Sequence, residues 1–236
     1  MKKFILLMCI LNEIVLSENK MIVLIGGEKG GAGKSCLAQN LSVYLQQQGR
    51  DILLIDADPQ ATTTDWAQER AENPDVSNIK SVQASGILKD TITDLSKKYQ
   101  DIVIDVGGAN SQSLRSGMVF STHLLLPFRP KRRDLRTLDK MAQLIDMAKS
   151  FNATLKVNAI ITQCPTLPSQ YSRILKAKEL CESYDIAPLN AVTFQRNVYD
   201  DTEENGLSVL EVDYDDKAKI EIHEIALEMF GDLNHG

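Results

Sequence analysis

Short, mostly apolar runs alternate with stretches of helical periodicity along the chain from Met21 onward. The runs show little polar alternation, a pattern typical of strands whose two faces are both buried. Strands are predicted at residues 21–25, 51–56, 78–82, 101–105, 123–127, 157–162 and 188–193.

The stretches between these runs place apolar residues three and four positions apart, as amphipathic helices do. The clearest example is 134–151, where Leu135, Leu138, Met141 and Ile145 share one face. Strands that alternate with helices form a parallel sheet joined by right-handed crossovers. The pattern therefore predicts an α/β fold, a doubly wound, mostly parallel sheet with helices on both faces. Helices are expected from Leu37 to Leu45 and at residues 59–72, 87–99, 112–120, 134–151, 170–184 and 216–230.

Domain organisation follows from the same pattern. No repeat or linker interrupts residues 21–236, so a single domain is expected there. Residues 1–20 are expected to be an N-terminal extension, either disordered or upstream of a true start at Met21. Lys2 and Lys3 followed by FILLMCIL resemble a signal peptide. However, this apolar run is too short to span a membrane, and no small-residue cleavage site precedes Met21. Membrane anchoring by this segment is the alternative.

Composition narrows the classes of partner and compartment. The 236 residues carry a net charge of −6, so any nucleic-acid binding must come from a local basic patch. The four cysteines are widely spaced and show no zinc-binding pattern with the three histidines. Free thiols in a reducing compartment are expected, and the predicted location is cytoplasmic.

The ten residues GGEKGGAGKS, Gly26 to Ser35, lie between the first strand and the first helix. Strand, glycine-rich loop and helix form the context of a phosphate-binding loop. Its backbone amides and the helix N-terminus attract an anion. Lys34 would lie against the β- and γ-phosphates, and the Ser35 hydroxyl would reach Mg²⁺. The alternative is a glycine-rich turn with two solvated lysines.

Two predicted strands end in aspartate, at the sheet edge where ligands bind in open parallel sheets. Asp105 ends one strand and is followed by Gly107 and Gly108, as in a Walker B strand whose carboxylate holds Mg²⁺ through water. The other strand ends in the run Asp56-Ala-Asp58-Pro-Gln. A carboxylate there could orient the attacking water. Alternatively, Asp58 only caps the helix that follows Pro59.

The glycine-rich loop has an unusual form. Glu28 stands where a general P-loop has its first glycine, and a second lysine, Lys29, precedes Gly30-Gly31. This K-G-G-x-G-K-[ST] loop resembles the deviant Walker A motif of the ParA/MinD family of ATPases. The Asp56 to Gln60 run resembles the switch I region of ParA proteins. Residues 195–199 and 206–211 are similar to a late segment of the small plasmid-type ParA proteins such as ParF. The resemblance covers residues 21–211, and no helix-turn-helix region like that of the larger ParA type precedes them.

The resemblance implies a P-loop NTPase with ATP and Mg²⁺ as cofactors. Two subunits would close around two nucleotides as a homodimer, with Lys29 of each reaching the nucleotide of the other. The late segment would lie beside the base. The resemblance implies catalytic roles for Lys29, Lys34 and Asp58, nucleotide contacts from Gly30, Gly31, Ala32, Gly33, Lys34, Ser35, Cys36, Gln195 and Arg196, and metal binding by Ser35, Asp56 and Asp105.

By the same resemblance, the ATP-bound dimer would bind DNA non-specifically on the nucleoid. A centromere-binding or activating partner protein would stimulate a weak basal hydrolysis, and the cycle would segregate a plasmid or position cargo. Five basic residues between Arg129 and Arg136 depart from the family pattern. They could bind DNA, contact a nucleotide phosphate, pair with acids across a dimer, or merely be solvated. The DNA-contact candidates are Lys131, Arg132, Arg133, Arg173, Lys176 and Arg196.

Three relatives of the same fold offer alternatives. One is an ATP-dependent metabolic enzyme of the dethiobiotin synthetase kind, which would not need Lys29 across a dimer. A MinD-like protein would bind membranes through a basic C-terminal helix, but the last helix carries Glu221, Glu224 and Glu228, which oppose anionic lipid, so no membrane partner is predicted. An iron–sulfur reductase needs cysteines near the second switch, and residues 106–116 contain none.

Overall fold

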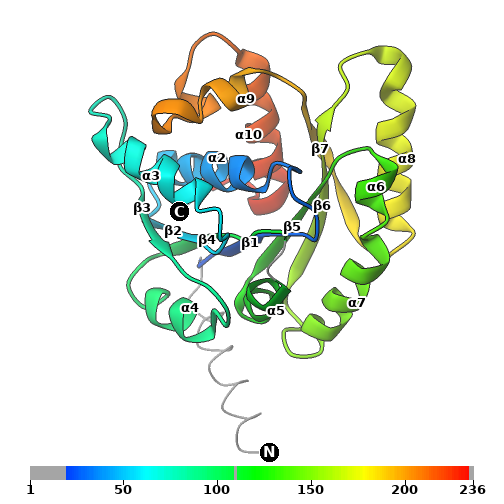
Figure 1. Ribbon diagram of the computed structural model, residues 1–236, viewed down its shortest axis with the longest axis horizontal. Coiled ribbons are helices and arrows are strands. Elements are labelled where there is room, and N and C mark those ends of the chain that lie inside the picture. The colour runs from blue at the N-terminus through cyan, green and yellow to red at the C-terminus, as the bar shows by residue number, and fades with distance from the viewer. Residues whose placement is uncertain (1–19, 109–110, 234–236) are drawn as a thin grey trace, which may run out of the picture.

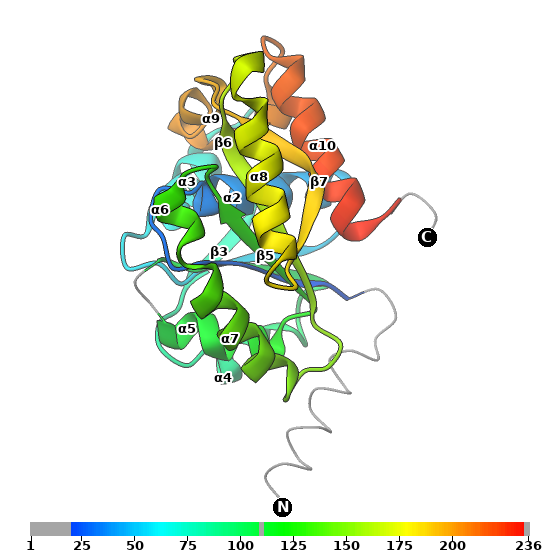
Figure 2. The same ribbon diagram turned by 90° about the vertical axis from the view of Figure 1, so that its right-hand side faces the viewer.

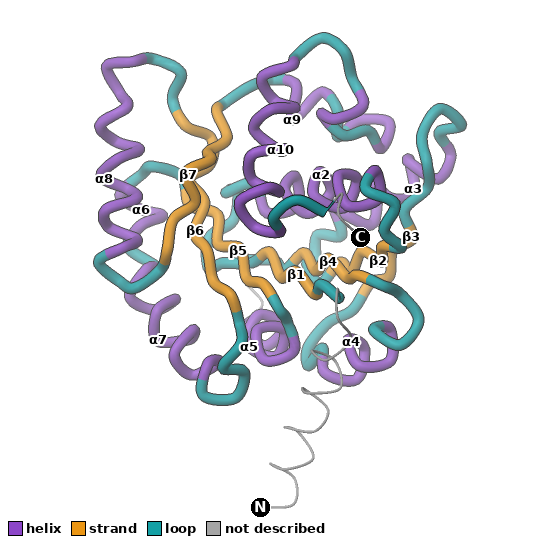
Figure 3. Tube along the Cα trace, turned by 180° about the vertical axis from the view of Figure 1, so that it is seen from behind, coloured by secondary structure: helices purple, strands orange, loops and turns teal. Residues whose placement is uncertain are grey.

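The computed structural model describes residues 20–108 and 111–233. Seven strands form one sheet in which every described pair of neighbours is parallel, in the order β3-β2-β4-β1-β5-β6-β7 (Figure 3). The predicted doubly wound α/β fold is therefore confirmed. The N-terminal extension lies almost wholly outside the described residues. The strands are β1 (Ile22–Ile25), β2 (Ile52–Asp56), β3 (Lys80–Gln83), β4 (Asp101–Asp105), β5 (His123–Phe128), β6 (Lys156–Cys164) and β7 (Ala187–Phe194).

Helices cover both faces of the sheet (Figure 1). One face is covered by α2 (Lys34–Gln47), α3 (Thr62–Glu72) and α10 (Asp216–Phe230). The other face carries α4 (Lys89–Leu95), α5 (Ser111–Phe120), α7 (Leu138–Lys149) and α8 (Tyr171–Glu182). Short elements complete the described chain: α6 (Arg132–Leu135), η1 (Pro168–Gln170), α9 (Val198–Asp201), η2 (Glu204–Gly206) and η3 (Val209–Glu211). None of these described helices is long and apolar enough to cross a membrane.

The period of two in a strand divides the core into two hydrophobic layers. In β1, Ile22 and Leu24 pack in the layer of α4, α5, α7 and α8, whereas Val23 and Ile25 pack in the layer of α2, α3 and α10. All four side chains are fully buried. The absence of polar alternation in these strands is therefore explained, because each face of the sheet has its own apolar cover.

The chain reverses its winding direction at β1, which lies between β4 and β5. The register sets Ile25 beside Asp105 and Asp105 beside Asp56. The ends of β1, β2 and β4 therefore meet at one edge of the sheet, together with the loop that follows β1. Such a switch point is where open parallel sheets bind ligands.

The predicted helix 134–151 is wrong in one respect, because the structure divides it into α6 and α7. The Thr137 hydroxyl donates to the carbonyl oxygen of Asp134 at 2.8 Å, and the Thr137 amide donates to the same oxygen at 3.1 Å. The carboxylate of Asp134 is itself turned inward and is only 1% exposed. This side-chain competition for a helical carbonyl breaks the helix although the apolar spacing continues across the break.

Candidate nucleotide-binding site

The loop between β1 and α2 has the shape of an anion cradle. Gly31 and Gly33 adopt φ angles of 71° and 82°, which side-chain-bearing residues rarely adopt. Gly33 is also the N-cap of α2, and its carbonyl accepts from Leu37 at 3.0 Å. No side chain caps this helix start. The free amides of the first turn are therefore available to a phosphate.

Lys34 is 6% exposed at the base of the loop. Its Nζ donates to the carbonyl oxygen of Lys29 at 2.7 Å. Burial lowers the pKa of Lys34, while the carboxylates of Asp105 and Asp58 raise it. The ammonium thus lies among acidic groups at the point where phosphate oxygens would enter, and it bridges the two ends of the loop.

The end of β6 supports the loop from its other side, which the sequence did not predict. Thr162 Oγ1 donates to the carbonyl oxygen of Ala32 at 2.8 Å, and Gln163 Nε2 donates to that of Gly31 at 3.0 Å. Gln163 has a φ of 49°, an uncommon conformation for a residue with a side chain. A strained residue that touches a phosphate loop is typical of a ligand site.

Asp105 lies at the end of β4 with no exposed surface. Its Oδ2 accepts from the Thr63 hydroxyl at 2.7 Å, but its Oδ1 is buried without a hydrogen-bond partner among the described residues. Burial raises the pKa of Asp105 to about 6, and the hydroxyls of Thr63 and Ser35 oppose this rise. A buried unpaired carboxylate oxygen next to a P-loop serine fits a Mg²⁺ ion with its bound waters.

A protein-only metal site is absent from the described residues. They contain no group of three His, Cys, Asp or Glu side chains that could hold a metal ion. A Mg²⁺ ion beside Ser35 and Asp105 would therefore need oxygens from phosphate and water, as is usual for this ion.

Asp56, the other predicted metal ligand, is occupied by hydrogen bonds. Its Oδ2 accepts from the amide and the hydroxyl of Thr64 at 2.8 and 2.9 Å, and its Oδ1 accepts from the Asp58 amide at 3.0 Å. Asp56 therefore caps the start of α3 from five residues before the helix. The alternative that Asp58 caps this helix is wrong, because Asp58 Oδ1 accepts from the Gln60 amide instead, at 3.0 Å.

Asp58 lies against the glycine pair that follows β4. A Cβ at Gly107 would come within 2.5 Å of the Asp58 carboxyl carbon. A Cβ at Gly108 would come within 2.9 Å of the backbone nitrogen of Gly30. Both glycines are therefore required for close approach: the first to the aspartate, the second to the phosphate loop. This contact brings the ends of β1, β2 and β4 into one site.

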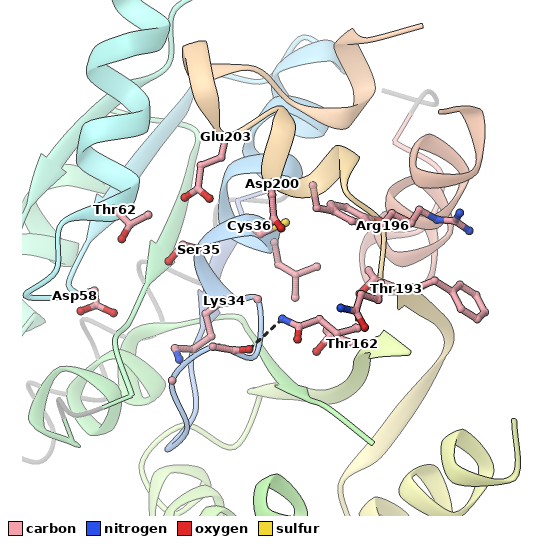
Figure 4. A pocket seen from close by; sticks show the side chains of 18 of the residues that line it. Lys34, Ser35, Cys36, Asp58, Thr62, Thr162, Thr193, Arg196, Asp200 and Glu203 are labelled. Atoms are coloured by element: carbon pink, nitrogen blue, oxygen red, sulfur yellow. Dashed lines mark hydrogen bonds between the residues drawn. The ribbon is translucent and has the colours of Figure 1, made fainter. Parts of the chain in front are cut away.

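A cavity of about 370 Å³ lies at the phosphate loop, and Lys34, Ser35 and Asp58 are part of its lining (Figure 4). Figure 4 shows Lys34, Ser35 and Asp58 at one end and Asp200 and Glu203 at the other. The cavity thus has a cationic loop at one end and acidic side chains, which accept hydrogen bonds, at the other. The lining also includes Gly30, Gly31, Gly33, Cys36, Leu37, Gln60, Thr62, Thr162, Gln163, Thr193, Phe194, Gln195, Arg196 and Tyr199.

The late segment lines part of the cavity, but the Arg196 side chain is bound outside it. Gln195 and Arg196 both line the cavity, yet Figure 4 shows the Arg196 side chain directed away from it. Arg196 Nε donates to Glu221 of α10 at 2.7 Å. The same carboxylate accepts from the Phe194 amide and the Tyr199 hydroxyl at 3.1 and 2.7 Å. Glu221 therefore holds the segment in place from outside the cavity.

A comparison with known protein families identifies the family to which this domain belongs. Residues 23–180 match the CbiA family, described as the CobQ/CobB/MinD/ParA nucleotide binding domain. The chain belongs to this family. The resemblance to ParA/MinD proteins that the loop and the Asp56 to Gln60 run predicted is thereby confirmed.

Two curated relatives illustrate how much of the chain is matched. Protein ParA of Rhizobium radiobacter is 29% identical over 124 residues, which are 52% of this chain and 55% of that protein. The chain thus matches about half the length of this relative. The maintenance of carboxysome distribution protein A of Halothiobacillus neapolitanus is 25% identical over 213 residues, 84% of this chain and 90% of that protein.

Solved structures show the same fold. A McdA–ATP complex from Cyanothece superposes with a TM-score of 0.71 at 16% identity, over 90% of this chain and 98% of that one. Another solved structure of this architecture holds an ATP analogue together with magnesium. The prediction of ATP and Mg²⁺ as cofactors is therefore confirmed for this family.

Within this CobQ/CobB/MinD/ParA domain, the lysine that marks the deviant loop is free. Lys29 is exposed, and its side chain makes no hydrogen bond or ion pair with any described residue. Its neighbour Glu28 is instead held by Lys140 of α7 at 2.8 Å. The phosphate loop therefore carries an exposed ammonium that is unpaired among the described residues.

Some of the residues predicted to contact DNA lie together on the surface. Arg132 and Arg136 from the α6 region and Arg173 and Lys176 from α8 line one groove, together with Pro130, Leu135, Ala177, Leu180 and Tyr184. Figure 2 shows α6 and α8 side by side. None of these four cations forms an ion pair with a described residue. Lys131 and Arg133 are exposed beside them, whereas Arg196 is bound to Glu221 and lies apart.

Proposed function

We propose that this protein is a ParA-like ATPase that binds ATP with Mg²⁺, dimerises around it and positions DNA or another cargo through hydrolysis. The observation that carries this proposal is the cavity lined by the P-loop cradle and the Asp58 carboxylate. The Asp105 carboxylate, with its buried unpaired oxygen, lies at the neighbouring strand end beside Ser35 of that lining. These are the parts that phosphoryl transfer requires.

In the binding step, the amides of Gly30 to Ser35 would receive the phosphates, and Lys34 would exchange its bond to the Lys29 carbonyl for phosphate oxygens. Ser35 and Asp105 would hold the metal, Asp105 through a water. Asp56 would contribute only indirectly, since its oxygens already hold Thr64 and Asp58. When bound, Mg²⁺ neutralises charge on the β- and γ-phosphate oxygens.

In the hydrolytic step, Asp58 would orient the attacking water and accept its proton. The carboxylate is half-buried, it lies at the phosphate end of the cavity, and among the described residues only its Oδ1 accepts a hydrogen bond, from the Gln60 amide. Its other oxygen is free to bind water. A positioned carboxylate of this kind contributes about 10²–10⁴-fold to a rate.

Dimerisation is proposed because the Lys29 side chain forms no hydrogen bond or ion pair with the described residues of its own subunit. In a face-to-face dimer, the lysine of one protomer would reach the phosphates of its partner and stabilise charge that develops during transfer. Hydrolysis would then depend on the dimer, and a lone subunit would be nearly inactive. A partner protein that favours the closed dimer would stimulate turnover.

The cationic groove between α6 and α8 is proposed to bind DNA phosphates without sequence preference. Four unpaired cations on an acidic protein form a local attraction for a polyanion, and affinity must fall steeply as salt rises. The proposed location is accordingly the cytoplasm, on the nucleoid. A centromere-binding or activating partner completes the proposal.

The test is ATP hydrolysis measured with and without non-specific duplex DNA, with DNA retention measured in ATP and in ADP. We expect weak basal hydrolysis, retention with ATP but not with ADP, and loss of both in Lys34→Ala. In Lys29→Gln, hydrolysis should collapse while ATP binding persists. Replacing Lys131, Arg132 and Arg133 together should weaken DNA binding and flatten its salt dependence.

The family includes CobQ and CobB as well as MinD and ParA, so the main rival is an ATP-dependent enzyme that acts on a small molecule. Such an enzyme would turn over ATP as a monomer, would not respond to DNA, and would be insensitive to Lys29→Gln. These outcomes together would overturn the partition proposal.

A further inference from the structure

The basic run after β5 divides into two groups that point to different places. Arg132 and Arg136 line the groove shared with α8. Arg129, the first cation of the run, instead reaches the phosphate loop. The two groups of cations therefore have different partners, and Arg129 must be considered with the nucleotide site.

Arg129 is held by a buried carboxylate. Its Nε donates to Asp134 Oδ2 at 2.6 Å, and its Nη2 donates to Asp134 Oδ1 at 3.1 Å. The Asp134 side chain is 1% exposed and that of Arg129 is 22% exposed. A two-pronged pair with one buried partner fixes the plane of the guanidinium, which a surface ion pair does not.

The fixed guanidinium of Arg129 contacts the tip of the phosphate loop. Nη2 also donates to the carbonyl oxygen of Gly30 at 3.5 Å. Nη1 lies 3.5 Å from the position that a Cβ at Gly31 would occupy, and it has no hydrogen-bond partner among the described residues. Arg129 therefore binds Gly30, lies beside Gly31, and keeps a further N–H donor available.

We propose that Arg129, oriented by Asp134, is a positioning residue of the nucleotide site that sets the Gly30–Gly31 turn and makes the site prefer ATP over ADP. This inference rests on the proposed function. Arg129 does not line the cavity, so it acts through the loop and through its charge. A terminal phosphate adds negative charge near the loop tip, and a fixed cation behind that tip favours it over the diphosphate.

The electrostatics of the loop agree with this role. Arg129 is one of the groups that lower the pKa of Lys34, and Asp134 is one that raises it. The pair is therefore close enough to the P-loop lysine to act on its charge. A change in the phosphates at Lys34 would be felt by Arg129 in return.

The experiment separates this role from simple support of the fold. Arg129→Gln leaves the Asp134 carboxylate buried without a partner and should lower the urea midpoint. The double variant R129Q/D134N removes that unpaired charge and should recover part of the midpoint. Arg129→Lys keeps the charge but loses the two-pronged geometry. Lys149→Gln, an exposed cation in α7, is the control.

The measurement is the ratio of ATP to ADP affinity with Mg²⁺, by titration calorimetry. We expect the ratio to fall about tenfold in both R129Q and R129Q/D134N, because one cation near the terminal phosphate is lost. Arg129→Lys should retain most of it, and Lys149→Gln should leave it unchanged. A folded double variant with the wild-type ratio would overturn the inference. If the wild-type protein binds no nucleotide, the proposed function fails first.

Discussion

The carboxylate of Asp58 and the backbone of Gly107 are in direct contact, and the space between them admits no side chain. A Cβ at position 107 would come 2.5 Å from the Asp58 carboxyl carbon and its Oδ2. Asp58 follows β2 and Gly107 follows β4, so the contact joins the ends of two neighbouring strands. The position of the proposed catalytic carboxylate is therefore set by a glycine.

Gly107→Ala should displace Asp58 without unfolding the protein, because the end of a half-buried side chain can move aside. We expect hydrolysis to fall at least about tenfold, since the water-orienting group is misplaced. ATP binding should persist. Steady-state hydrolysis and calorimetric binding check this prediction. Gly117→Ala in α5, whose Cβ would meet Leu24 at 3.0 Å, is the control: it should cost stability, but turnover of the folded fraction should not change.

Ala61, between the Asp58 turn and α3, has a φ of 58°. This left-handed conformation costs an L-residue about 1–2 kcal/mol, whereas glycine loses about 0.5–1 kcal/mol through its freer unfolded state. Ala61→Gly should therefore raise the free energy of unfolding by about 0.5 kcal/mol. Urea denaturation is the measurement. The exposed Ala71→Gly in α3 should lose about 1 kcal/mol, and equal losses at both positions would refute the strain.

Arg70 is fully buried and binds Glu211 through two nitrogens, at 2.8 and 2.7 Å. It also donates to the carbonyl oxygens of Gly206 and Ser77 at 2.9 and 2.8 Å. Glu211→Gln should lower the free energy of unfolding by about 3 kcal/mol, because a buried guanidinium loses its counter-charge. Asp213→Asn, which breaks only the exposed pair with Lys219, should change it by less than about 0.5 kcal/mol. Similar losses of unfolding free energy in both variants would contradict a stabilising role for the buried Arg70–Glu211 pair.

Glu221 gathers Phe194, Arg196 and Tyr199 behind the cavity. Glu221→Gln should loosen the late segment and raise the KM for ATP by about threefold to tenfold with a smaller change in kcat, because the phosphate loop is untouched. Initial-rate kinetics separate the two effects. The exposed Glu224→Gln on the same helix is the control. A loss confined to kcat would indicate a role for Glu221 at the reacting phosphates.

The elements of the site that are local in sequence were predictable. The loop Gly26 to Ser35 and the strand ends at Asp56 and Asp105 each combine a motif with its own strand or helix, so their places in the sheet follow from topology. Asp58 was correctly placed at this edge of the sheet. The alternative interpretation, in which Asp58 caps the helix after Pro59, was wrong. The capping falls to Asp56, which reaches Thr64 through a turn that no spacing rule describes.

The site residues that could not be predicted from the sequence are those positioned by contacts between distant segments. The support of the phosphate loop by Thr162 and Gln163 joins residues about 130 apart, as its hydrogen bonds show. The short elements η2 and η3 are held by Trp66 and Arg70, which donate to the carbonyl oxygens of Leu207 and Gly206, and by the Arg70–Glu211 pair. The division of the basic run into two groups could not be predicted either. It depends on the buried carboxylate of Asp134, which holds Arg129 beside the loop.

The most direct test of the account is calorimetric titration of the protein with ATP in the presence of Mg²⁺, with and without Lys34→Ala. The account predicts one nucleotide per chain in the wild-type protein, weaker binding when Mg²⁺ is chelated, and no measurable binding in the variant. Equal binding by the two proteins, or no dependence on the metal, would contradict a triphosphate held by Gly30 to Ser35.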